Sequence, residues 1–214
     1  LPICNSMPYS IDSSSDRCYP GTSCLMNKFD IHDAQKLDEL ESSIVYGKLA
    51  LLQHIPIPGS FDFAHYKRIH QFLFCDLYDW AGQIRDVDLF KKGTAFVPAS
   101  DIERCADALF GRLQAFRPEN LSRREIIENI ADFYNTLNML HPFREGNGRT
   151  QRVFFTQWVT QKLGWHLDLA STNSDELMIA TIYAAQGVMD YLIDCFDGAL
   201  QITEMDSGIQ MDLL

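Results

Sequence analysis

The sequence lacks an excess of basic residues, since its 18 Lys and Arg are outnumbered by 29 Asp and Glu and the formal net charge is −11. Proteins that bind nucleic acids generally carry a basic surface that displaces counterions from the phosphate backbone. The sequence also lacks any apolar run close to the roughly 18 residues that a membrane-spanning helix needs. The composition therefore disfavours both a nucleic-acid partner and a membrane span.

Sequence patterns for metal and phosphate sites of common types are missing too. None of the six cysteines forms a Cys-x-x-Cys pair, and their spacing matches no metal template, so we expect free thiols in a reducing compartment. The Gly-x4-Gly-Lys-Ser/Thr string of a P-loop is absent, which excludes that mode of phosphate binding. No basic-then-apolar signal peptide opens the chain, and this favours a cytosolic protein.

What the sequence does contain is a series of amphipathic helices. Apolar residues make up 46% and charged residues 22%, which is typical of a packed domain. Apolar positions at helical spacing predict helices over about 33–54, 63–78, 100–116, 122–140, 149–163, 175–186 and 188–200. The alternation in "RDVDLF", followed by a glycine and "AFVP", predicts one β-hairpin over about 86–98, with Gly93 in the turn and Pro98 ending the second strand. We therefore expect the all-α class: a helical bundle with one hairpin.

The chain is expected to form a single domain. Residues 1–30, rich in Ser, Pro and Gly, indicate an irregular N-terminal arm, residues 31–200 the domain itself, and residues 201–214 a frayed C-terminal tail. Helix ends are marked by two capping boxes and one C-terminal glycine: Ser100 with Glu103, Ser122 with Glu125, and Gly164.

One short loop between two predicted helices concentrates residues suited to phosphate chemistry. Gly146, Asn147 and Gly148 tolerate unusual backbone angles and come just before a helix N-terminus. Such a turn can aim several N–H groups at one point, where the helix dipole adds partial positive charge. Arg149 and Arg152 are three residues apart on the new helix, so both can reach an anion at that end.

The same loop offers a carboxylate and an imidazole. Glu145 would be repelled by a bound phosphate unless a cation lay between them, and Mg²⁺ is the natural candidate. His141, at the other edge of the loop, is suited to act as a general base near neutral pH. Phe143 is predicted to fix the loop to the core. Phosphate binding, a metal and a base together indicate phosphoryl or nucleotidyl transfer.

The string "HPFREGNGR" followed by "TQR" resembles the Fic family pattern H-x-F-x-[D/E]-G-N-G-R-x-x-R at every specified position. The segments "YPGTSCLMNKFDI" and "IHQFLFCDLYDWAGQIR" are similar to the family's N-terminal arm and to its helix before the hairpin, so the resemblance covers about residues 19–200. The strongest match is to bacterial Fic proteins in which toxin and inhibitor are separate chains. This resemblance implies a Fic fold and a protein adenylyltransferase, which moves AMP from ATP to a Ser, Thr or Tyr hydroxyl of a protein substrate.

The resemblance also implies a role for each loop residue. His141 would be the base that deprotonates the target hydroxyl, and Glu145 would hold Mg²⁺ against the α- and β-phosphates. The remaining residues would bind the nucleotide, with the N–H groups of the turn as an anion hole, the first arginine on the β-phosphate and the second on the γ-phosphate: Gly146, Asn147, Gly148, Arg149, Thr150, Gln151 and Arg152.

The predicted hairpin would be the family's flap, formed here by Thr94, Ala95, Phe96 and Val97. The flap would pair with an extended stretch of the target by strand addition, and Phe96 would clamp that stretch. A role as a flap explains why the chain has a single hairpin, because an isolated pair of strands is only marginally stable in water.

Several alternatives stay open at this point. A similar loop in some relatives transfers UMP or phosphocholine, and a helical interaction module could bind a nucleotide without transfer. The inhibitory pattern [S/T]-x-x-x-E-[G/N], whose Glu pairs with the residue equivalent to Arg152, is absent from this sequence. Either a separate small helical protein supplies it in a bacterial cytosol, or the chain is an effector secreted into a host-cell cytosol that needs no inhibitor.

Overall fold

The computed structural model describes residues 10–11, 17–91, 94–169 and 172–202. Within these ranges helices form most of the fold: α1 (Ala34–His54), α2 (Phe63–Phe74), α3 (Ile102–Ala115), α4 (Arg123–Leu140), α5 (Asn147–Leu163), α6 (Ser174–Ala185) and α7 (Asp190–Ala199), with a short 3-10 turn at Ala99–Asp101. The predicted mainly helical class is confirmed, and most helix ends lie within two residues of the prediction. The predicted second helix is the exception, because α2 ends four residues early.

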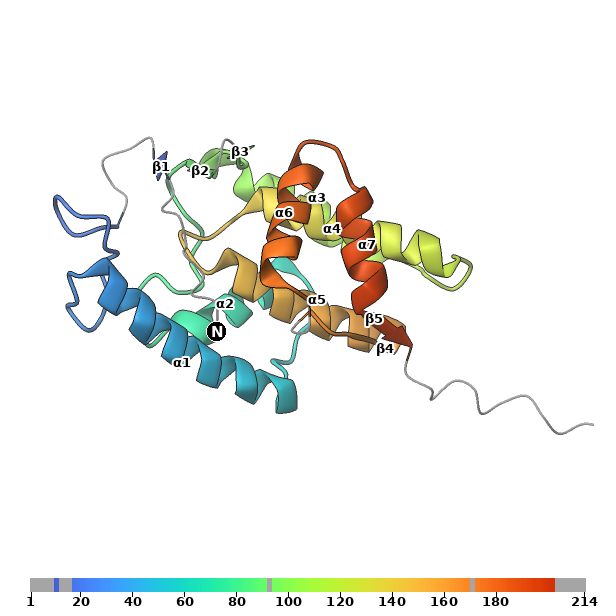
Figure 1. The fold of residues 1–214 in the computed structure, drawn as a ribbon, viewed down its shortest axis with the longest axis horizontal. Coiled ribbons are helices and arrows are strands. Elements are labelled where there is room, and N and C mark those ends of the chain that lie inside the picture. The colour runs from blue at the N-terminus through green and yellow to red at the C-terminus, as the bar shows by residue number, and fades with distance from the viewer. Residues whose placement is uncertain (1–9, 12–16, 92–93, 170–171, 203–214) are drawn as a thin grey trace, which may run out of the picture.

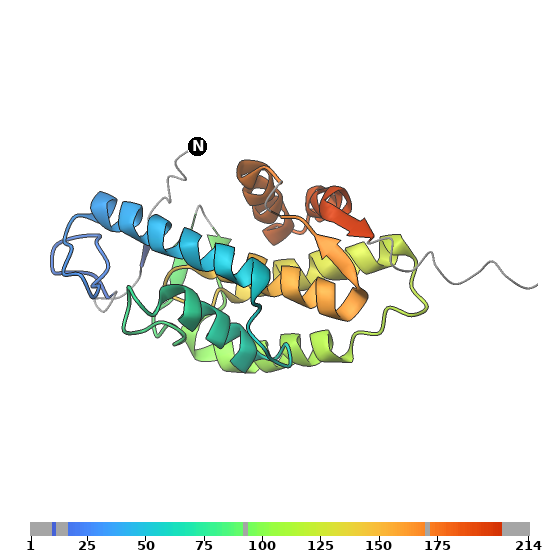
Figure 2. The same cartoon turned by 90° about the horizontal axis from the view of Figure 1, so that it is seen from below.

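Helices α4 and α5 run through the middle of the molecule, joined by the loop that contains His141 (Figure 1). Helix α2 packs on α5, and α3 and α7 pack on α4. In Figure 1, α6 and α7 lie on the opposite side of α5 from α1 and α2, and Figure 2 shows the same bundle from below. The loop between α4 and α5 is thus fixed at both ends by helices of the central core.

Aromatic side chains dominate the core around α5. The Phe154 ring lies 5.4 Å from that of Tyr66 on α2 and 5.6 Å from that of Phe110 on α3, both edge-on. Phe155 and Trp158 are also almost completely buried and lie 6.1 Å apart, ring to ring. Large aromatic residues contribute much of the buried apolar area of a core, so α5 has a rigid foundation below the loop.

Two of the three predicted helix-end signals are confirmed. Ser122 and Glu125 form the reciprocal capping box at the start of α4, and Gly164 ends α5 with φ 68°. The box at Ser100 is wrong, because the chain first makes the 3-10 turn and α3 begins at Ile102. The Asp88 side chain accepts the Ala99 N–H at 2.7 Å. A residue eleven positions earlier in the chain thus stabilises the start of the turn that leads into α3.

The predicted hairpin is confirmed, but a third strand joins it. Strands β2 (Leu89–Lys91) and β3 (Thr94–Ala95) pair antiparallel, and β1 (Ser10–Ile11) pairs with the other edge of β2. The strand order β1-β2-β3 leaves β3 at an edge of the described sheet. The predicted turn residue Gly93 lies outside the described residues, and the second strand ends at Ala95 before Pro98.

A second small sheet was not predicted. Strands β4 (Trp165–Leu167) and β5 (Leu200–Ile202) pair antiparallel. Each has only three residues and its partner is distant in sequence, so neither produces a periodic pattern. Its position corrects the predicted boundary, because residues 201–202 of the expected tail belong to β5, and residues 203–214 lie outside the described part.

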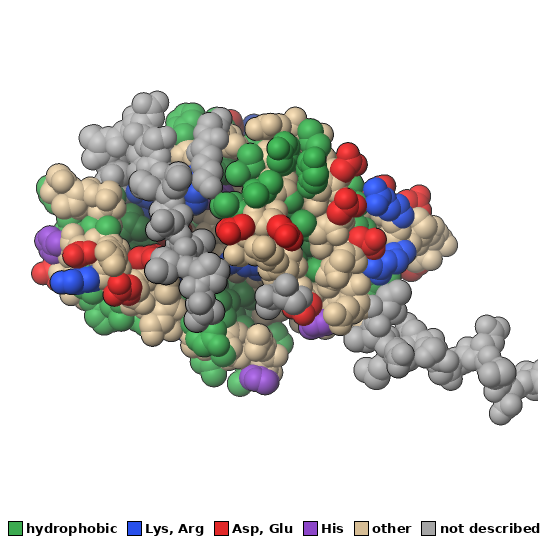
Figure 3. All heavy atoms as spheres, in the orientation of Figure 1, with side chains coloured by type: hydrophobic (Ala, Val, Ile, Leu, Met, Phe, Trp, Pro, Cys, Tyr) green, Lys and Arg blue, Asp and Glu red, His purple; other side chains and the backbone are tan. Residues whose placement is uncertain are grey.

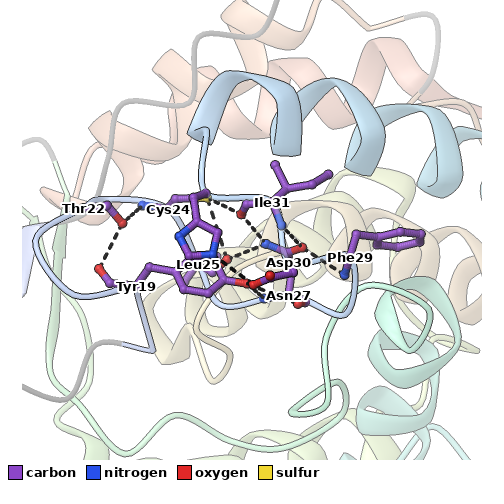
Figure 4. A network of polar contacts seen from close by, with 9 residues as sticks. Tyr19, Thr22, Cys24, Leu25, Asn27, Phe29, Asp30 and Ile31 are labelled. Carbon is purple, nitrogen blue, oxygen red and sulfur yellow. Dashed lines mark hydrogen bonds and ion pairs between the residues drawn. The ribbon is translucent and has the colours of Figure 1, made fainter.

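The described part of the predicted N-terminal arm is organised around Asn27 (Figure 4). The Asn27 amide donates to the carbonyl oxygens of Leu25 and Ile31 at 2.9 and 2.8 Å, and its Oδ1 accepts the N–H groups of Phe29 and Ile31 at 3.1 Å. One side chain thereby closes the turn that leads into α1. Residues 1–9 and 12–16 of the arm lie outside the described residues.

The surface carries exposed apolar side chains on α6, on α7 and in the turn between them, gathered over the α6 region in Figure 3: Met178, Ile179, Tyr183, Val188 and Tyr191. Over the described ranges, none of the helices is both long enough and apolar enough to pass through a bilayer. The five cysteines in these ranges are free thiols, as expected, although only Cys24 is fully buried.

Candidate active site

The loop between α4 and α5 begins and ends with left-handed residues. His141 follows α4 with φ 43° and ψ 59°, and Gly146 precedes α5 with φ 79°. Glycine adopts this conformation without strain, and any Cβ at Gly146 would overlap the Phe74 ring. The two turns reverse the chain between the helices, so that the loop and the first turn of α5 form one compact unit.

The His141 side chain is buried and fixed in one orientation. Its Nδ1 lies 3.1 Å from the Asn138 carbonyl oxygen, and its ring stacks on Phe96 with centroids 3.8 Å apart. A carbonyl only accepts, so Nδ1 carries the proton and Nε2 has the lone pair of a base. Burial lowers the pKa of His141 to about 3. The imidazole is therefore neutral at physiological pH.

Phe143 fixes the loop to the core, as predicted. Its side chain is fully buried, with its ring stacked on those of His70 and Tyr66 at 3.8 and 5.3 Å. The Asn147 side chain closes the loop over it, accepting the Phe143 N–H at 2.9 Å and donating to the Phe143 carbonyl at 2.7 Å. The Asn147 amide is thus committed to the loop, and only its backbone N–H can join an anion hole.

Two residues assigned to the nucleotide site from the sequence point inward instead. The Thr150 hydroxyl donates to the Gly146 carbonyl at 2.9 Å, and the Gln151 amide donates to the Tyr134 carbonyl at 2.7 Å. Both side chains are buried. They therefore support the start of α5 from inside, Thr150 by its bond to the residue that caps the helix and Gln151 by its bond to α4, and neither buried polar side chain is left unpaired.

The charged residues of the site gather at the start of α5. Glu145 Oε1 accepts the Gly146 N–H at 2.9 Å and lies 3.5 Å from Nη2 of Arg149. Gly148 lies beside Arg152, since a Cβ added to it would come within 3.5 Å of Arg152 Nη1. The Arg152 side chain is half-buried. Burial raises the pKa of the Tyr134 hydroxyl, and Arg152 lies close enough to lower it. Partly exposed positive groups at a helix N-terminus suit an anionic ligand.

The hairpin predicted as a flap lies against this loop. Thr94 and Ala95 form the edge strand β3, the Phe96 N–H donates to the Leu89 carbonyl at 3.2 Å, and the Val97 N–H donates to the Met139 carbonyl at 3.0 Å. Because Phe96 also stacks on His141, the hairpin covers the imidazole from one side. An edge strand beside a base provides backbone groups to which an extended peptide can add.

The sequence matches a known family over this region. Residues 60–159, which include the hairpin and the loop, match the Fic/DOC family. A probable protein adenylyltransferase, y4lH of Sinorhizobium fredii, is 38% identical over 174 residues, covering 79% of this chain and 88% of the relative. The chain belongs to the Fic/DOC family. A probable protein adenylyltransferase Fic of Salmonella typhimurium is 34% identical over 65% of this chain and 69% of its own length.

Solved Fic structures agree with the fold. The BepC protein of Bartonella tribocorum with bound AMPPNP superposes with a TM-score of 0.78 at 30% identity, over 88% of this chain and 98% of that chain. A Fic domain from Bartonella quintana with bound ADP gives a TM-score of 0.78 at 29% identity, over 88% and 96%. The predicted Fic fold and the predicted class of protein adenylyltransferase are thereby confirmed.

Buried polar residues that the sequence did not indicate hold the Fic loop in place. Arg85 Nε donates to the His141 carbonyl at 2.8 Å, Nη1 donates to the Val87 carbonyl at 2.7 Å, and Nη2 donates to the Val97 carbonyl. His70 accepts the Gly82 N–H on Nδ1 at 2.8 Å and donates from Nε2 to the Glu145 carbonyl at 3.0 Å. Burial lowers the pKa of His70 to about 3. No periodic pattern signals these residues, because each acts on a segment far along the chain.

The two buried histidines predict a loss of stability in mild acid. In the folded protein His70 and His141 both have a pKa of about 3, against 6.5 for an exposed imidazole. As pH falls from 6.5 towards 3, the unfolded chain takes up protons that the folded chain excludes. The free energy of unfolding should therefore fall by up to about 1.4 kcal/mol per pH unit for each histidine. Urea unfolding at about pH 7.5 and about pH 5 measures this, and equal midpoints would contradict it.

Proposed function

We propose that this chain transfers AMP from ATP to a Ser, Thr or Tyr hydroxyl of another protein and releases pyrophosphate. The observation that carries the proposal is the state of His141, whose Nδ1 is committed to the Asn138 carbonyl, so that Nε2 can accept a proton beside the N-terminus of α5. The Fic proteins named above with bound AMPPNP and ADP support a nucleotide at this place. The similarity to probable protein adenylyltransferases supports AMP as the group that is transferred.

In the proposed reaction, Nε2 of His141 takes the proton of the target hydroxyl as its oxygen attacks the α-phosphorus. A new oxygen–phosphorus bond forms, and the bond from the α-phosphorus to the bridging oxygen of pyrophosphate breaks. The backbone N–H groups of Gly146, Asn147 and Gly148 and the dipole of α5 would stabilise the charge on the phosphates. The Gly146 N–H, which donates to Glu145 Oε1 at 2.9 Å, would join the other two once that carboxylate releases it. Arg149 would bind the β-phosphate and Arg152 the γ-phosphate, which orients the α-phosphate for in-line attack.

The residues of the site fit Mg²⁺ held jointly with the nucleotide. Glu145 presents a carboxylate that is only partly buried, and no group of three or more metal-ligating side chains exists among the described residues. Mg²⁺ commonly binds in this way, through one or two carboxylates with phosphate oxygens and water completing its shell. When bound, the ion would neutralise charge on the α- and β-phosphates.

Transfer from labelled nucleotides in a cell lysate tests the function. We expect ATP labelled on the α-phosphate to label a protein band, whereas labelled UTP and CDP-choline should not. Labelling from UTP or CDP-choline in place of ATP would favour the UMP or phosphocholine alternative. Binding of ATP with no labelled band would favour a nucleotide-binding module without catalysis.

Replacement of Phe96 by alanine tests the flap. If the edge strand β3 positions an extended stretch of the target, Phe96→Ala should reduce modification of a protein target by about tenfold or more, in proportion to the lost anchor. Self-modification, which needs no docked strand, should fall much less. Phe90→Ala on the neighbouring strand β2 is the control, because that ring is partly exposed. Equal losses of both reactions in Phe96→Ala would show that the hairpin is only structural.

We further propose an inhibitor that acts in trans. The chain has no [S/T]-x-x-x-E-[G/N] stretch, yet Arg152, its expected partner, is present at the site. Helix α1 exposes Tyr46, Leu51 and Ile55, which gives a small helical protein an apolar surface near the 19–55 region. Its Glu would pair with Arg152 and occupy the place of the γ-phosphate, so that ATP could bind only in a non-productive pose.

Expression with and without the neighbouring small reading frame tests this regulation. Expression of the chain alone in a bacterial cytosol should slow growth, and co-expression should restore growth and suppress labelling. If the host tolerates the chain alone and the neighbour leaves labelling unchanged, the trans-inhibitor is wrong. The result would then support an effector secreted into a host-cell cytosol.

A further inference from the structure

Glu41 on α1 is a buried carboxylate outside the family loop. It is only 5% exposed, whereas none of the other charged residues of α1 is fully buried. Its Oε1 lies 2.5 Å from Nη2 of Arg149, and its Oε2 accepts the hydroxyl of Tyr78. A buried carboxylate is costly unless it is paired and hydrogen-bonded, and here both oxygens have partners.

The Arg149 guanidinium is held from two sides. Its carbon lies 4.8 Å from the centroid of the Phe74 ring, and its Nη2 points to Glu41, with Glu145 farther away at 3.5 Å. The ion pairs that the described residues make with Arg149 use Nη2. An arginine has five N–H donors in a fixed fork, and 23% of this side chain stays exposed. The rest of the fork can therefore receive an anion without a change of rotamer.

Two opposite effects on a phosphate follow from this contact. The negative charge of Glu41 repels a bound phosphate. The contact between Glu41 and Arg149, however, already restricts the arginine side chain to one rotamer, so that less side-chain conformational entropy is lost when the phosphate binds. Arginine keeps its charge in proteins, so the pair does not neutralise the guanidinium by proton transfer. We expect the fixed geometry to outweigh the repulsion, because Glu41 is buried and holds Nη2 from the interior.

We propose that Glu41, supported by Tyr78, is a positioning residue that presents Arg149 to the β-phosphate and so makes the site prefer nucleoside di- and triphosphates to monophosphates. The inference rests on the phosphate-binding role proposed above for Arg149. It gives α1 a part in nucleotide selectivity, because its single buried carboxylate determines where this guanidinium lies.

Binding of ADP and AMP by calorimetry separates positioning from simple stabilisation, because only ADP has a β-phosphate. Glu41→Met keeps the length and bulk of the side chain but removes the hydrogen-bond acceptor. We expect it to weaken ADP binding by about tenfold, which is typical when a residue that orients a ligand-binding side chain is lost. AMP binding should change by less than about twofold, since its phosphate does not reach Arg149. Glu41→Gln restores an acceptor and should recover most of the ADP affinity.

Lys48→Met is the matched control, because Lys48 is on the same helix and its ion pair with Asp76, at 2.7 Å, is remote from the loop. It should leave the ratio of ADP to AMP affinity unchanged even if the melting temperature falls. If Glu41→Met does not fold, Tyr78→Phe replaces it, with an expected loss of about threefold for ADP alone, in line with one lost hydrogen bond.

Arg149→Ala separates the phosphate-binding role of Arg149 from the positioning role of Glu41. If it leaves the ratio of ADP to AMP affinity unchanged, the proposed phosphate role of Arg149 is wrong. If Arg149→Ala lowers the ratio but Glu41→Met does not, or if Glu41→Met strengthens ADP binding by removing the negative charge, the positioning role of Glu41 alone is overturned.

Discussion

Replacement of His141 by alanine is expected to slow target modification by about 10²- to 10⁴-fold, the usual contribution of a general base. ATP affinity should stay nearly unchanged, because the phosphates are bound by the first turn of α5 and not by the imidazole. Labelling rates at saturating ATP, together with calorimetric Kd values, measure the two quantities separately. A near wild-type rate in this variant would refute the mechanism.

A second substitution of His141 tests whether the alanine variant is slow only because the loop has changed its conformation. His141 ends α4 in the left-handed conformation, which asparagine adopts more readily than alanine. His141→Asn should therefore keep the loop in place and still lose the base, so its rate should fall as far as that of the alanine variant. His166, exposed on β4, is the control, and His166→Ala should transfer AMP at the wild-type rate.

Removal of divalent metal is expected to abolish transfer. In the proposed reaction the charge that develops on the phosphates would need a cation as well as the two arginines, and Glu145 would hold it. Excess chelator should reduce labelling below detection, and added Mg²⁺ or Mn²⁺ should restore it. Full activity in chelator would count against a metal at this site.

Glu145→Gln tests the residue itself. Glutamine can still accept the Gly146 N–H that Glu145 Oε1 accepts at 2.9 Å, so the loop should keep its shape while the metal loses its charged ligand. We expect a slower rate and a higher Mg²⁺ concentration for half-maximal activity, on the order of tenfold. An unchanged Mg²⁺ requirement would show that Glu145 does not hold the ion.

The helices and the loop could be predicted because their signals are local. Apolar residues recur at helical spacing along each helix, and the residues from His141 to Arg152 lie within one short segment, where their types and order indicate the chemistry. Two of the boundary errors share one cause, which is a contact from elsewhere in the chain. Asp88 stabilises the entry to α3, and the β4–β5 pair brings together segments separated by two helices.

The residues that hold the loop could not be predicted for the same reason. Glu41 contacts Arg149 across 108 positions, His70 contacts Glu145 across 75, and Arg85 contacts His141 across 56. Each looks in the sequence like an ordinary polar residue of a helix or turn. Only the folded chain, with α1 packed on α2 and α2 packed on α5, shows that they are buried beside the site.

The contacts of Arg85 also define what could be exchanged between relatives. A single guanidinium ties the His141 carbonyl to backbone carbonyls on both sides of the hairpin, at Val87 and Val97. If this hairpin alone were transferred to a relative without an arginine at that position, the strand would lose its anchor and the recipient's histidine carbonyl would have no such donor. The smallest transferable module for target choice is therefore the continuous stretch 85–97, arginine included, and engineers who redirect such an enzyme would graft that stretch whole.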